Sequence, residues 1–317
     1  MRCLCCNKEL KEQNNTGWHL SCIKKFFKAN KLPIIDISKE KLELLAIENV
    51  IKGFTIPGVQ TKLSLHLSKE DDPRLTLINY PTGYILKPQT PEYSMLPECE
   101  FLVMQMANAT KIKTVPFALI KIDSTDEFAY LTKRIDRVND EALAMEDFCQ
   151  LENRLTADKY KGSYERCAKV IMKYSVNPGM DVAELFLRVV FSYVVGNSDM
   201  HLKNFSLIET FVNSQEYILS PAYDMLPVSI ILPEDDEALA LSLNGKKKNI
   251  RRNDFLVFAE SIGLTISQAK KMIDKIISLK DIYLSMCRDS YLSDELKTRM
   301  QLLIEERIGL LTKKELK

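Results

Sequence analysis

The stretch "VVGNSDMHLKNFSLIE", residues 194–209, decides how the rest of the chain is interpreted. It places Asp199, His201 and Asn204 close together, between an apolar run and a short strand-like run, in a chain with only three histidines. Phosphoryl transfer needs a carboxylate that orients the attacking hydroxyl, metal ligands and a cation on the phosphates. Asp199 and Asn204 stand five positions apart, as the aspartate and asparagine of a kinase catalytic loop do. The stretch therefore predicts a phosphoryl-transfer site.

The chain before this stretch has the pattern of strands arranged around one helix. Leu63, Leu65 and Leu67 alternate with polar residues, which indicates a half-buried strand. Phe101, Met104 and Ala107 are spaced as on one face of a helix. We predict a three-stranded antiparallel meander, one helix and two further strands, at residues 60–68, 74–79, 84–88, 96–111, 115–122 and 128–136.

The chain after about residue 140 has a mainly helical pattern. The clearest helix covers residues 181–196, is apolar nearly all round and should be buried, with Asp181 as its cap, Glu184 at the capping-box position and Gly196 at its end. Residues 204–209 and 216–220 form a predicted hairpin, and helices follow, one of them over residues 293–311. The fold class is α+β, a protein-kinase-like two-lobe fold with a β-rich N-lobe and a mainly helical C-lobe.

Further site residues stand where a kinase fold needs them. Asp224 follows the hairpin as a metal ligand, and Lys87 ends the third strand. Glu100 is the best partner for this lysine and Glu98 the second. Each residue alone has an ordinary explanation: a solvated lysine, acids that favour a helix N-terminus, or a turn-forming aspartate. Their joint occurrence in the right order favours the kinase interpretation.

Half of the eight cysteines lie in the first 22 residues. Cys3 and Cys6 form C-x2-C, and His19 and Cys22 form H-x2-C, which is the pairing that tetrahedral zinc requires. Cys5 could replace Cys3 or Cys6, and the segment could instead be a reduced start that binds nothing. We predict three parts: a Cys/His-rich segment with a possible zinc knuckle at 1–45, an N-lobe at 46–138 and a C-lobe with the catalytic loop at 139–317.

Composition narrows the setting of this chemistry. The chain has 317 residues and a net charge of about +1, so bulk charge gives no reason to expect nucleic-acid or membrane binding. No apolar run approaches the roughly 20 residues of a membrane span. We therefore expect a cytoplasmic protein without a membrane partner.

One part of an ordinary kinase is missing from the sequence. No G-x-G-x-x-G occurs between residues 50 and 70, where the chain has "GFTIPGVQTKLSL" at 53–65 with Gly58 inside it. Backbone N–H groups in such a turn can still hold phosphates.

The sequence, including this departure, resembles one known family. The motifs "TIPGVQTKLSL", "YILKP", "ECEF", "TKRIDR", "EDFCQ", "GNSDMHLKNFSL", "AYDML" and "LSLNGK" together are similar to the HipA/HipT family of serine/threonine kinases, over roughly residues 50–311. These kinases are toxins of bacterial toxin–antitoxin systems. The short chain before the phosphate loop looks more like HipT than HipA, which has an additional N-terminal subdomain.

The resemblance implies a role for each matching residue, with ATP and Mg²⁺ as cofactors. Asp199 would be the catalytic aspartate, Asn204 and Asp224 would hold Mg²⁺, and Lys87, paired with Glu100, would contact the ATP phosphates. Lys133 to Ile135 would be the adenine hinge, with Asp136 near the ribose, although the family has glutamate and phenylalanine where this chain has Lys133 and Ile135. The nucleotide site as a whole would be lined by Pro57, Gly58, Val59, Gln60, Thr61, Lys62, Lys133, Arg134, Ile135, Asp136, His201, Lys203, Asn204, Tyr223 and Asp224.

The family autophosphorylates a serine before the phosphate-loop glycine, and HipT can carry a second one two residues later. The matching positions here are Thr55 and Pro57, of which only Thr55 has a hydroxyl. A phosphate adds about −1.5 to −2 charge, which would eject the loop from the ATP site. We predict autophosphorylation of Thr55.

The resemblance also implies partners. They are a HipB-like antitoxin, a HipS-like small protein and an aminoacyl-tRNA synthetase as substrate, with DNA reached only through the antitoxin. The basic loop 245–254 is either a solvated turn or a contact for an acidic or tRNA-bound substrate. Two other readings stay open: a small-molecule kinase of the aminoglycoside or choline type, which also carries D-x-H-x-x-N, and a non-enzymatic module that binds an antitoxin.

Overall fold

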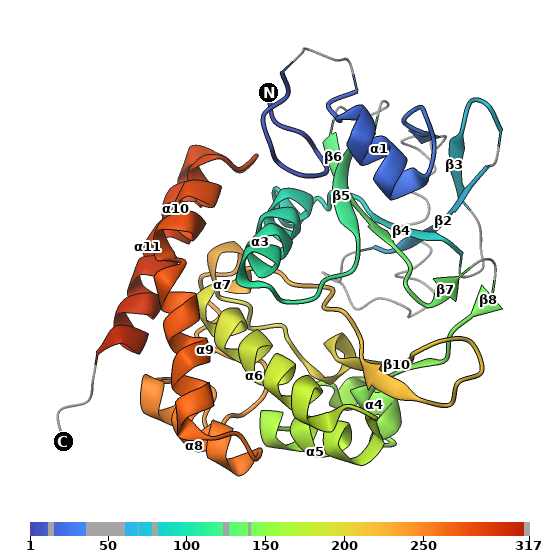
Figure 1. Cartoon of the computed structure of the whole chain (residues 1–317). Coiled ribbons are helices and arrows are strands. Elements are labelled where there is room, and N and C mark those ends of the chain that lie inside the picture. Colours follow the sequence, from blue (N-terminus) through green and yellow to red (C-terminus); the bar gives the residue numbers. More distant parts are fainter. Residues whose placement is uncertain are drawn as a thin grey trace. The chain divides into compact units, whose positions relative to one another are not determined.

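The computed structural model of the chain describes residues 1–11, 16–35, 61–68, 70–77, 82–122, 127–138 and 141–313 (Figure 1). The chain divides into two compact units. The first consists of Met1–Phe101 and Val115–Arg137, and the second of Leu102–Thr114 and Val138–Lys317. Among the described residues, no helix combines the length and the apolar character that crossing a membrane requires.

The first unit is built on a six-stranded sheet with the strand order β1-β3-β2-β4-β6-β5. Leu65 and Leu86 are fully buried, so the alternation that predicted these strands reports the face covered by the core. The helix α1 (Leu20–Phe27) precedes the sheet. The strands are β1 (Ile34–Ile35), β2 (Leu63–Leu67), β3 (Arg74–Leu77), β4 (Tyr84–Lys87), β5 (Phe117–Ile122) and β6 (Glu127–Lys133).

The predicted meander is wrong in its strand order. β4 pairs with β2, with Leu63 opposite Leu86, and β2 also pairs with β3, so β2 lies between the other two strands. Two strand spacings of about 4.8 Å amount to roughly 10 Å, which four extended residues of roughly 3.3 Å each can span, and the sequence has more residues than that between Leu77 and Tyr84. The parallel pair β1–β3 had no signal in the sequence pattern, since β1 has only two residues.

The helix α3 (Leu96–Thr110) is the predicted helix and is divided between the two units. Phe101, Met104 and Ala107 are all buried, as their helical spacing predicts. In the first unit Phe101 packs edge-on against Phe117 of β5, with ring centroids 5.7 Å apart. In the second unit Thr110 shares a hydrogen bond of 2.6 Å with the Tyr283 hydroxyl.

The second unit is mainly helical. β7 (Arg137–Val138), where the chain passes from the first unit to the second, pairs with β8 (Glu141–Ala142). A three-stranded sheet has the order β11-β10-β9, from β9 (Met145–Asp147), β10 (Ser206–Glu209) and β11 (Tyr217–Leu219). The helices are α4 (Phe148–Leu151), η1 (Thr156–Asp158), α5 (Tyr164–Tyr174), α6 (Pro178–Val194), η2 (Leu202–Asn204), α7 (Val228–Ile231), α8 (Arg252–Ser261), α9 (Ile266–Ser278), α10 (Lys280–Arg288) and α11 (Asp294–Thr312).

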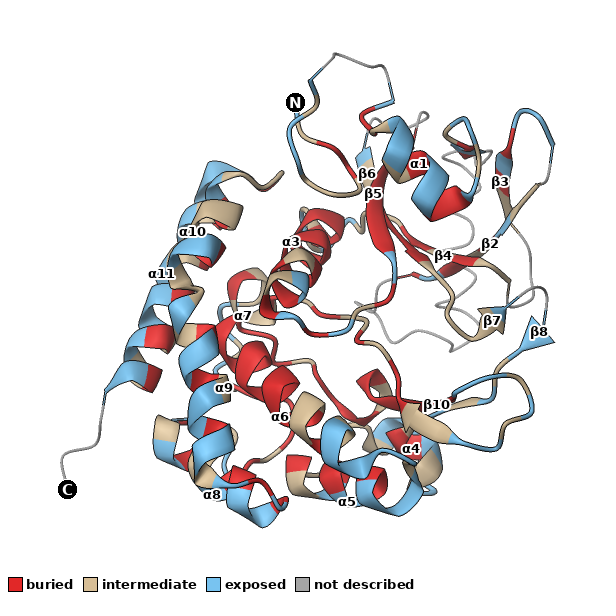
Figure 2. Ribbon diagram, in the orientation of Figure 1, coloured by how far each residue is buried: buried red, intermediate tan, exposed pale blue. Residues whose placement is uncertain are grey.

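The helix α6 is the buried helix that the apolar run predicts, and it appears red along much of its length in Figure 2. It begins three residues earlier than expected, at Pro178, because proline fits the first helical position. The predicted cap is therefore wrong. Asp181 lies inside the first turn, where its carboxylate accepts hydrogen bonds from the Ser175 hydroxyl and the Leu219 N–H.

Gly196 ends this segment, as predicted, with a φ of +68°. A Cβ at this position would come within 2.5 Å of a Leu303 side-chain carbon and 2.9 Å of Ser229 Cβ. Both the backbone conformation and the close packing therefore require glycine. The turn directs the chain into residues 197–204, which precede the predicted hairpin β10–β11.

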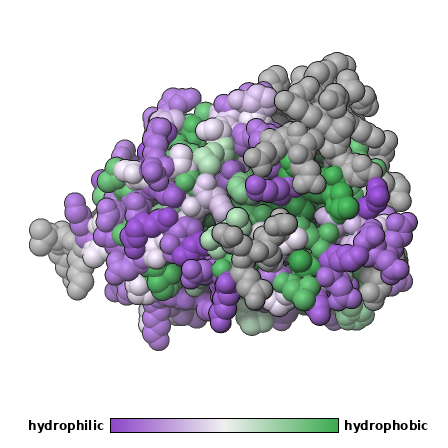
Figure 3. Space-filling view, turned by 90° about the horizontal axis from the view of Figure 1, so that it is seen from above, coloured by the Kyte–Doolittle hydropathy of each residue, from purple (hydrophilic) through white to green (hydrophobic). Residues whose placement is uncertain are grey.

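Burial separates the core from the water-facing surface. The outer faces of α10 and α11 are largely exposed, whereas β5 and α6 are largely buried (Figure 2). Hydrophilic residues cover much of the face seen in Figure 3, with hydrophobic residues between them.

Candidate active site

The loop between α6 and β10 holds the predicted catalytic aspartate and asparagine side by side in the second unit. Asn204 is buried, and its Nδ2 donates a hydrogen bond of 2.8 Å to the backbone oxygen of Asp199. The Asn197 side chain accepts from the Asp199 N–H at 3.2 Å. The Asn204 amide nitrogen is thus bound within the loop, and its Oδ1 is the kind of oxygen ligand that Mg²⁺ prefers.

His201 lies inside the same loop as a buried, neutral ring. Its Nε2 is 3.8 Å from Asp199 Oδ1, and its backbone N–H donates to the Asp199 oxygen at 2.8 Å. Burial lowers the pKa of His201 to about 4, although the Asp199 charge opposes the shift. The ring is therefore uncharged at neutral pH and does not neutralise the aspartate.

The second predicted metal ligand, Asp224, follows β11 with a φ of +54°. Aspartate is one of the few residues that adopt this left-handed conformation readily. The preceding Tyr223 anchors the segment to the loop, because its hydroxyl donates to the Lys203 oxygen at 3.1 Å and lies 2.5 Å from Ser206 Oγ. Sequence reasoning had placed Tyr223 in the nucleotide site, and the structure gives it these contacts within the protein.

A buried arginine supports the segment that leads to Asp224. Arg188 of α6 pairs with Glu184 at 3.0 Å and donates to the Ser220 oxygen at 2.8 Å. The capping box predicted for Glu184 is wrong, because the carboxylate is used for this ion pair and for the Lys113 N–H. No sequence signal indicated Arg188, which looks like one charged residue in an apolar helix.

Lys203, predicted to face the nucleotide, is paired within the second unit. Its Nζ lies 2.7 Å from Asp147 Oδ2. The other carboxylate oxygen of Asp147 caps α4 by accepting from the Gln150 N–H. The pair therefore ties the catalytic loop to the beginning of α4.

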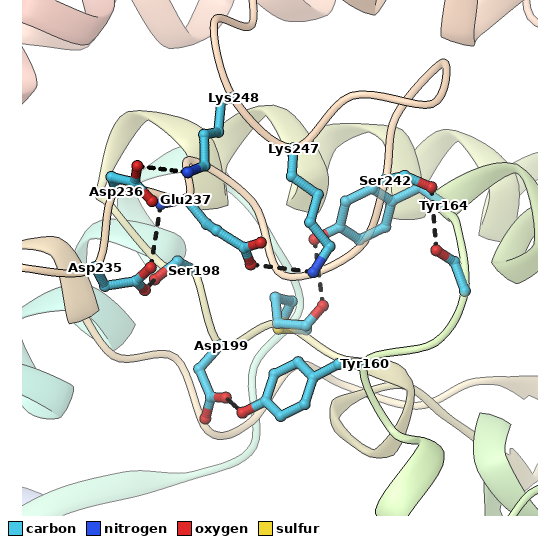
Figure 4. A network of polar contacts seen from close by, with 12 residues as sticks. Tyr160, Tyr164, Ser198, Asp199, Asp235, Asp236, Glu237, Ser242, Lys247 and Lys248 are labelled. Atoms are coloured by element: carbon cyan, nitrogen blue, oxygen red, sulfur yellow. Dashed lines mark hydrogen bonds and ion pairs between the residues drawn. The ribbon is translucent and has the colours of Figure 1, made fainter.

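Tyr160 is a site residue that sequence reasoning missed. Its hydroxyl donates a hydrogen bond to Asp199 Oδ1 (Figure 4). Its ring stands edge-on to His201, with centroids 5.0 Å apart, and Lys159 Nζ lies 5.0 Å from the Tyr160 ring. It lies 39 positions before Asp199, in an irregular segment that carries no motif.

In the first unit, the predicted lysine and glutamate form a buried ion pair. Lys87 Nζ at the end of β4 lies 2.6 Å from Glu100 Oε1 of α3, and the two side chains are 3% and 0% exposed. Lys87 also lies 5.2 Å from the centre of the Tyr130 ring. An ammonium held in this way by a helix glutamate is the arrangement that a kinase uses for its phosphate-contacting lysine.

Glu98, the second candidate, has a different environment. It is 8% exposed, and its Oε2 has no hydrogen-bond partner within the described part of the chain. Burial, with a smaller contribution from the charge of Glu127, raises the pKa of Glu98 to about 7. Of the two glutamates, the structure brings only Glu100 to Lys87.

The predicted hinge, Lys133 to Ile135, and the residues that follow it interact with each other and with neighbouring backbone. Asp136 pairs with Arg134 at 2.6 Å and with Arg137 at 2.7 Å. Burial favours the neutral form of Asp136, but hydrogen bonds and the two arginine charges outweigh it and lower its pKa. The N–H groups of Lys133 and Arg134 donate to the Pro116 and Gly83 oxygens. The backbone N–H groups of Lys133 and Arg134 are therefore both used in hydrogen bonds within the protein. Ile135 is the next residue of the hinge.

The predicted phosphate loop lies mostly outside the described residues. Pro57, Gly58, Val59 and Gln60, and also Thr55, fall in the interval 36–60. The two remaining residues of the loop are described: Thr61 is buried and Lys62 is exposed.

The predicted N-terminal ligands come together in the first unit. One ligand atom each from Cys3, Cys6, His19 and Cys22 lies within 4.8 Å of the other three. Cys5, which the sequence left open as a ligand, is not in this group of described residues.

The basic loop carries ion pairs with acids of the second unit. Lys247 pairs with Glu237 at 3.0 Å, and Lys248 with Asp236 (Figure 4). Lys246 pairs with Asp254 at 2.7 Å. These contacts favour the solvated turn of the two readings given above.

A hollow of about 630 Å³ lies away from these residues in the second unit, and its chemistry is not that of the predicted site. It is lined by Leu151, Glu152, Asn153, Arg166, Lys169, Val170, Lys173 and Tyr174.

Comparison with known proteins defines the class. Residues 54–281 match the model of the HipA-like C-terminal domain, which covers most of the chain. The chain therefore belongs to the family that carries the HipA-like C-terminal domain. Its fold is the α+β, protein-kinase-like fold, with a sheet-rich and a helical unit.

Individual relatives agree with this membership. "Putative kinase Y4dM" of Sinorhizobium fredii is 32% identical over 240 residues, which are 70% of this chain but only 58% of that protein. A "Putative kinase" of Haemophilus influenzae is 29% identical over 259 residues, 73% of this chain and 74% of that protein.

Two solved structures share the fold. HipA from the Shewanella oneidensis MR-1 complex of HipA, HipB and operator DNA has a TM-score of 0.66 and 19% identity, over 81% of this chain and 65% of that one. The Helicobacter pylori proinflammatory kinase CtkA has a TM-score of 0.51 and 15% identity, over 75% of this chain and 88% of its own.

Proposed function

We propose that the chain is an ATP- and Mg²⁺-dependent serine/threonine-protein kinase that acts as the toxin of a HipBA- or HipBST-type toxin–antitoxin system. The observation that carries the proposal is the buried ion pair between Lys87 and Glu100, 2.6 Å long, in a member of the HipA-like family. Burying two charges is costly, and an enzyme that must hold a lysine against phosphates gives a reason for it.

Each unit supplies its own part of the chemistry. In the first unit, Lys87 would contact the ATP phosphates, and Glu100 fixes its ammonium through their ion pair. In the second unit, the Asp199 carboxylate accepts a hydrogen bond from the attacking hydroxyl and orients it. Asn204 Oδ1 and the Asp224 carboxylate would hold Mg²⁺, and the bound ion would supply charge neutralisation at the phosphates. The hydrogen bond from Asn204 Nδ2 to the backbone oxygen of Asp199 holds these two residues next to each other.

Regulation by autophosphorylation follows from the same proposal. Thr55 is the hydroxyl-bearing residue at the matching position before Gly58, whereas Pro57 cannot accept a phosphate. A phosphate on Thr55 would add about −1.5 to −2 charge to the loop and remove it from the triphosphate by repulsion.

The proposed partners are a HipB-like antitoxin and a HipS-like small protein, and the proposed substrate is an aminoacyl-tRNA synthetase. The solved HipA relative was crystallised with HipB and operator DNA, which supports an antitoxin as partner.

The test is phosphoproteomics in a bacterium that expresses the wild-type chain or Asp199→Asn. The wild type should add phosphate to a serine or threonine of a synthetase and to Thr55, and should slow growth. The variant, which keeps the shape of the side chain but loses its charge, should do neither. A purified synthetase panel and a sugar and aminoglycoside panel, each given labelled ATP, identify the acceptor class.

Three results would overturn parts of this proposal. Transfer to the small molecules alone would favour the small-molecule kinase. Growth inhibition that persists in Asp199→Asn would favour a binding module. Thr55 without phosphate after incubation with ATP would remove the regulatory part.

A further inference from the structure

Within the described residues 1–11 and 16–28 of the first unit, three thiols and one imidazole lie close together. Cys3 and Cys6 lie in a turn that begins the chain, and Cys22 lies in the first turn of α1. His19 is the residue just before α1. The ligand atoms of all four lie within 4.8 Å of one another, and the eight cysteines of the chain are all free thiols.

The distances suit one small metal ion. Tetrahedral zinc holds sulfur at about 2.3 Å and nitrogen at about 2.0 Å, so its ligand atoms lie roughly 3.5–3.8 Å from each other. His19 Nδ1 is 3.4 Å from Cys6 Sγ and 3.9 Å from Cys22 Sγ. Both distances from the imidazole therefore match the spacing of ligands on adjacent corners of a tetrahedron.

The contacts around the cluster prepare these atoms for a metal. His19 Nε2 lies 3.1 Å from the Glu9 oxygen, so this nitrogen donates its proton there and leaves Nδ1 as the lone-pair ligand. The backbone N–H of His19 points at Cys3 Sγ at 3.4 Å, which stabilises a thiolate. Such second contacts of ligating side chains are typical of built metal sites.

The turn between the first two cysteines also has the shape of a knuckle. The Cys3 N–H donates to the Lys8 oxygen and the Asn7 N–H to the Cys3 oxygen, both at 2.8 Å. Asn7 has a φ of +55°, which turns the chain back after Cys6. Backbone hydrogen bonds thus fix the turn that carries both cysteines.

We propose that Cys3, Cys6, His19 and Cys22 bind a single structural Zn²⁺ that fixes this segment against the sheet carrying Lys87. With four protein ligands the site is closed, which is the pattern of structural rather than catalytic zinc.

The segment connects the metal site to the sheet. The Leu119 N–H of the edge strand β5 donates to the Leu4 oxygen at 2.8 Å, one residue beyond Cys3. Phe26 and Phe27 of α1 pack on Tyr84, with centroids 6.0 and 5.6 Å away, at the other end of the strand that carries Lys87. Removal of zinc should therefore loosen both contacts.

The test measures metal in the untagged full-length chain by inductively coupled plasma mass spectrometry. The wild type should contain close to one zinc ion per chain, and Cys22→Ser and Cys6→Ser should each lose most of it. Cys5→Ser is the matched control, because this neighbouring thiol is outside the group, and it should keep its zinc.

Cobalt gives a second measurement that needs no variant. After its zinc has been replaced by Co²⁺, the wild type should show thiolate-to-cobalt charge transfer and the intense visible absorption of tetrahedral cobalt. The proposal would be overturned if the wild type contained no metal as purified and gave no such spectrum with cobalt. It would also be overturned if the wild type contained iron in place of zinc, or if Cys5→Ser lost as much zinc as Cys6→Ser and Cys22→Ser. Neither measurement depends on phosphoryl transfer, so the proposed kinase activity can fail without affecting this one.

Discussion

At the scale of single residues, the hydrogen bond from the Tyr160 hydroxyl to Asp199 is the contact that most directly affects the proposed chemistry. It donates to the carboxylate oxygen of Asp199, and the Tyr160 ring packs edge-on against His201. A carboxylate can accept several hydrogen bonds, so this contact leaves Asp199 able to accept another from a substrate hydroxyl. Tyr160 is therefore a positioning residue for the aspartate.

Tyr160→Phe should lower kcat by roughly ten- to a hundredfold, because hydrogen bonds to charged groups are worth about 1.5–3 kcal/mol. The ring contact with His201 remains, so KM for ATP should not change. Steady-state kinetics with labelled ATP measure both constants. Tyr174→Phe on α5, an exposed tyrosine, is the control and should match the wild type. An unchanged or higher kcat in Tyr160→Phe would show that the hydroxyl does not hold the aspartate.

The raised pKa of Glu98 should make the free energy of unfolding depend on pH. Its pKa is about 7 in the folded chain and near 4.5 in a free carboxyl. Between these values the unfolded chain loses the proton first, so the free energy of unfolding falls as pH rises through this window and levels off above it. The total loss is about 3 kcal/mol for this 8% exposed side chain.

Glu98→Gln should therefore match the wild type near pH 5 and exceed its free energy of unfolding near pH 8. Urea unfolding at the two pH values measures the difference, and the exposed Glu92→Gln is the control. A variant that differs from the wild type by the same amount at both pH values would show that Glu98 ionises normally.

At the scale of elements, the strand β4 and the helix α3 are joined by the ion pair between Lys87 and Glu100. Removing one partner of a buried pair leaves the other charge without compensation, which costs about 3–5 kcal/mol. Replacing both partners avoids that cost.

Glu100→Gln should thus lower the free energy of unfolding by about 3–5 kcal/mol, and Lys87→Met with Glu100→Gln should recover much of the loss. A double-mutant cycle in urea measures the coupling. The pair Lys31–Asp72 has the same 2.6 Å length but is 66% and 73% exposed, so Asp72→Asn should cause no measurable loss. Additive effects at Lys87 and Glu100 would contradict a coupled pair.

The sequence pattern predicted those elements whose signals are local. The alternation of Leu63, Leu65 and Leu67 and the spacing of Phe101, Met104 and Ala107 follow from burial of one face, and the structure has a strand and a helix there. The order of β2, β3 and β4 was predicted wrongly, because alternation reports which face is buried and carries no information on which neighbour pairs.

The contacts of the candidate site also divide into those that sequence patterns could predict and those that they could not. The pairing of Lys87 with Glu100 could be predicted from the order of elements in a kinase fold, and the grouping of Cys3, Cys6, His19 and Cys22 from their spacing. Tyr160 and Arg188 could not, because their contacts join segments far apart in sequence. The internal contacts of Lys203 and Asp136 also escaped prediction, since an ion pair depends on tertiary structure.

At the scale of the whole molecule, each of the two compact units has its own core and its own part of the proposed machinery. The first holds the Lys87–Glu100 pair and the proposed zinc segment, and the second holds Asp199, Asn204 and Asp224. Membership of the HipA-like family covers parts of both units, since residues 54–281 match. The central claim is that the second unit binds Mg²⁺ for phosphoryl transfer.

A crystal structure of the chain with Mg²⁺ and a non-hydrolysable ATP analogue tests that claim most directly. The account predicts that Asn204 Oδ1 and a carboxylate oxygen of Asp224 are both ligands of a magnesium ion that also binds the phosphates. A bound nucleotide and metal with both side chains turned away from the ion would contradict it.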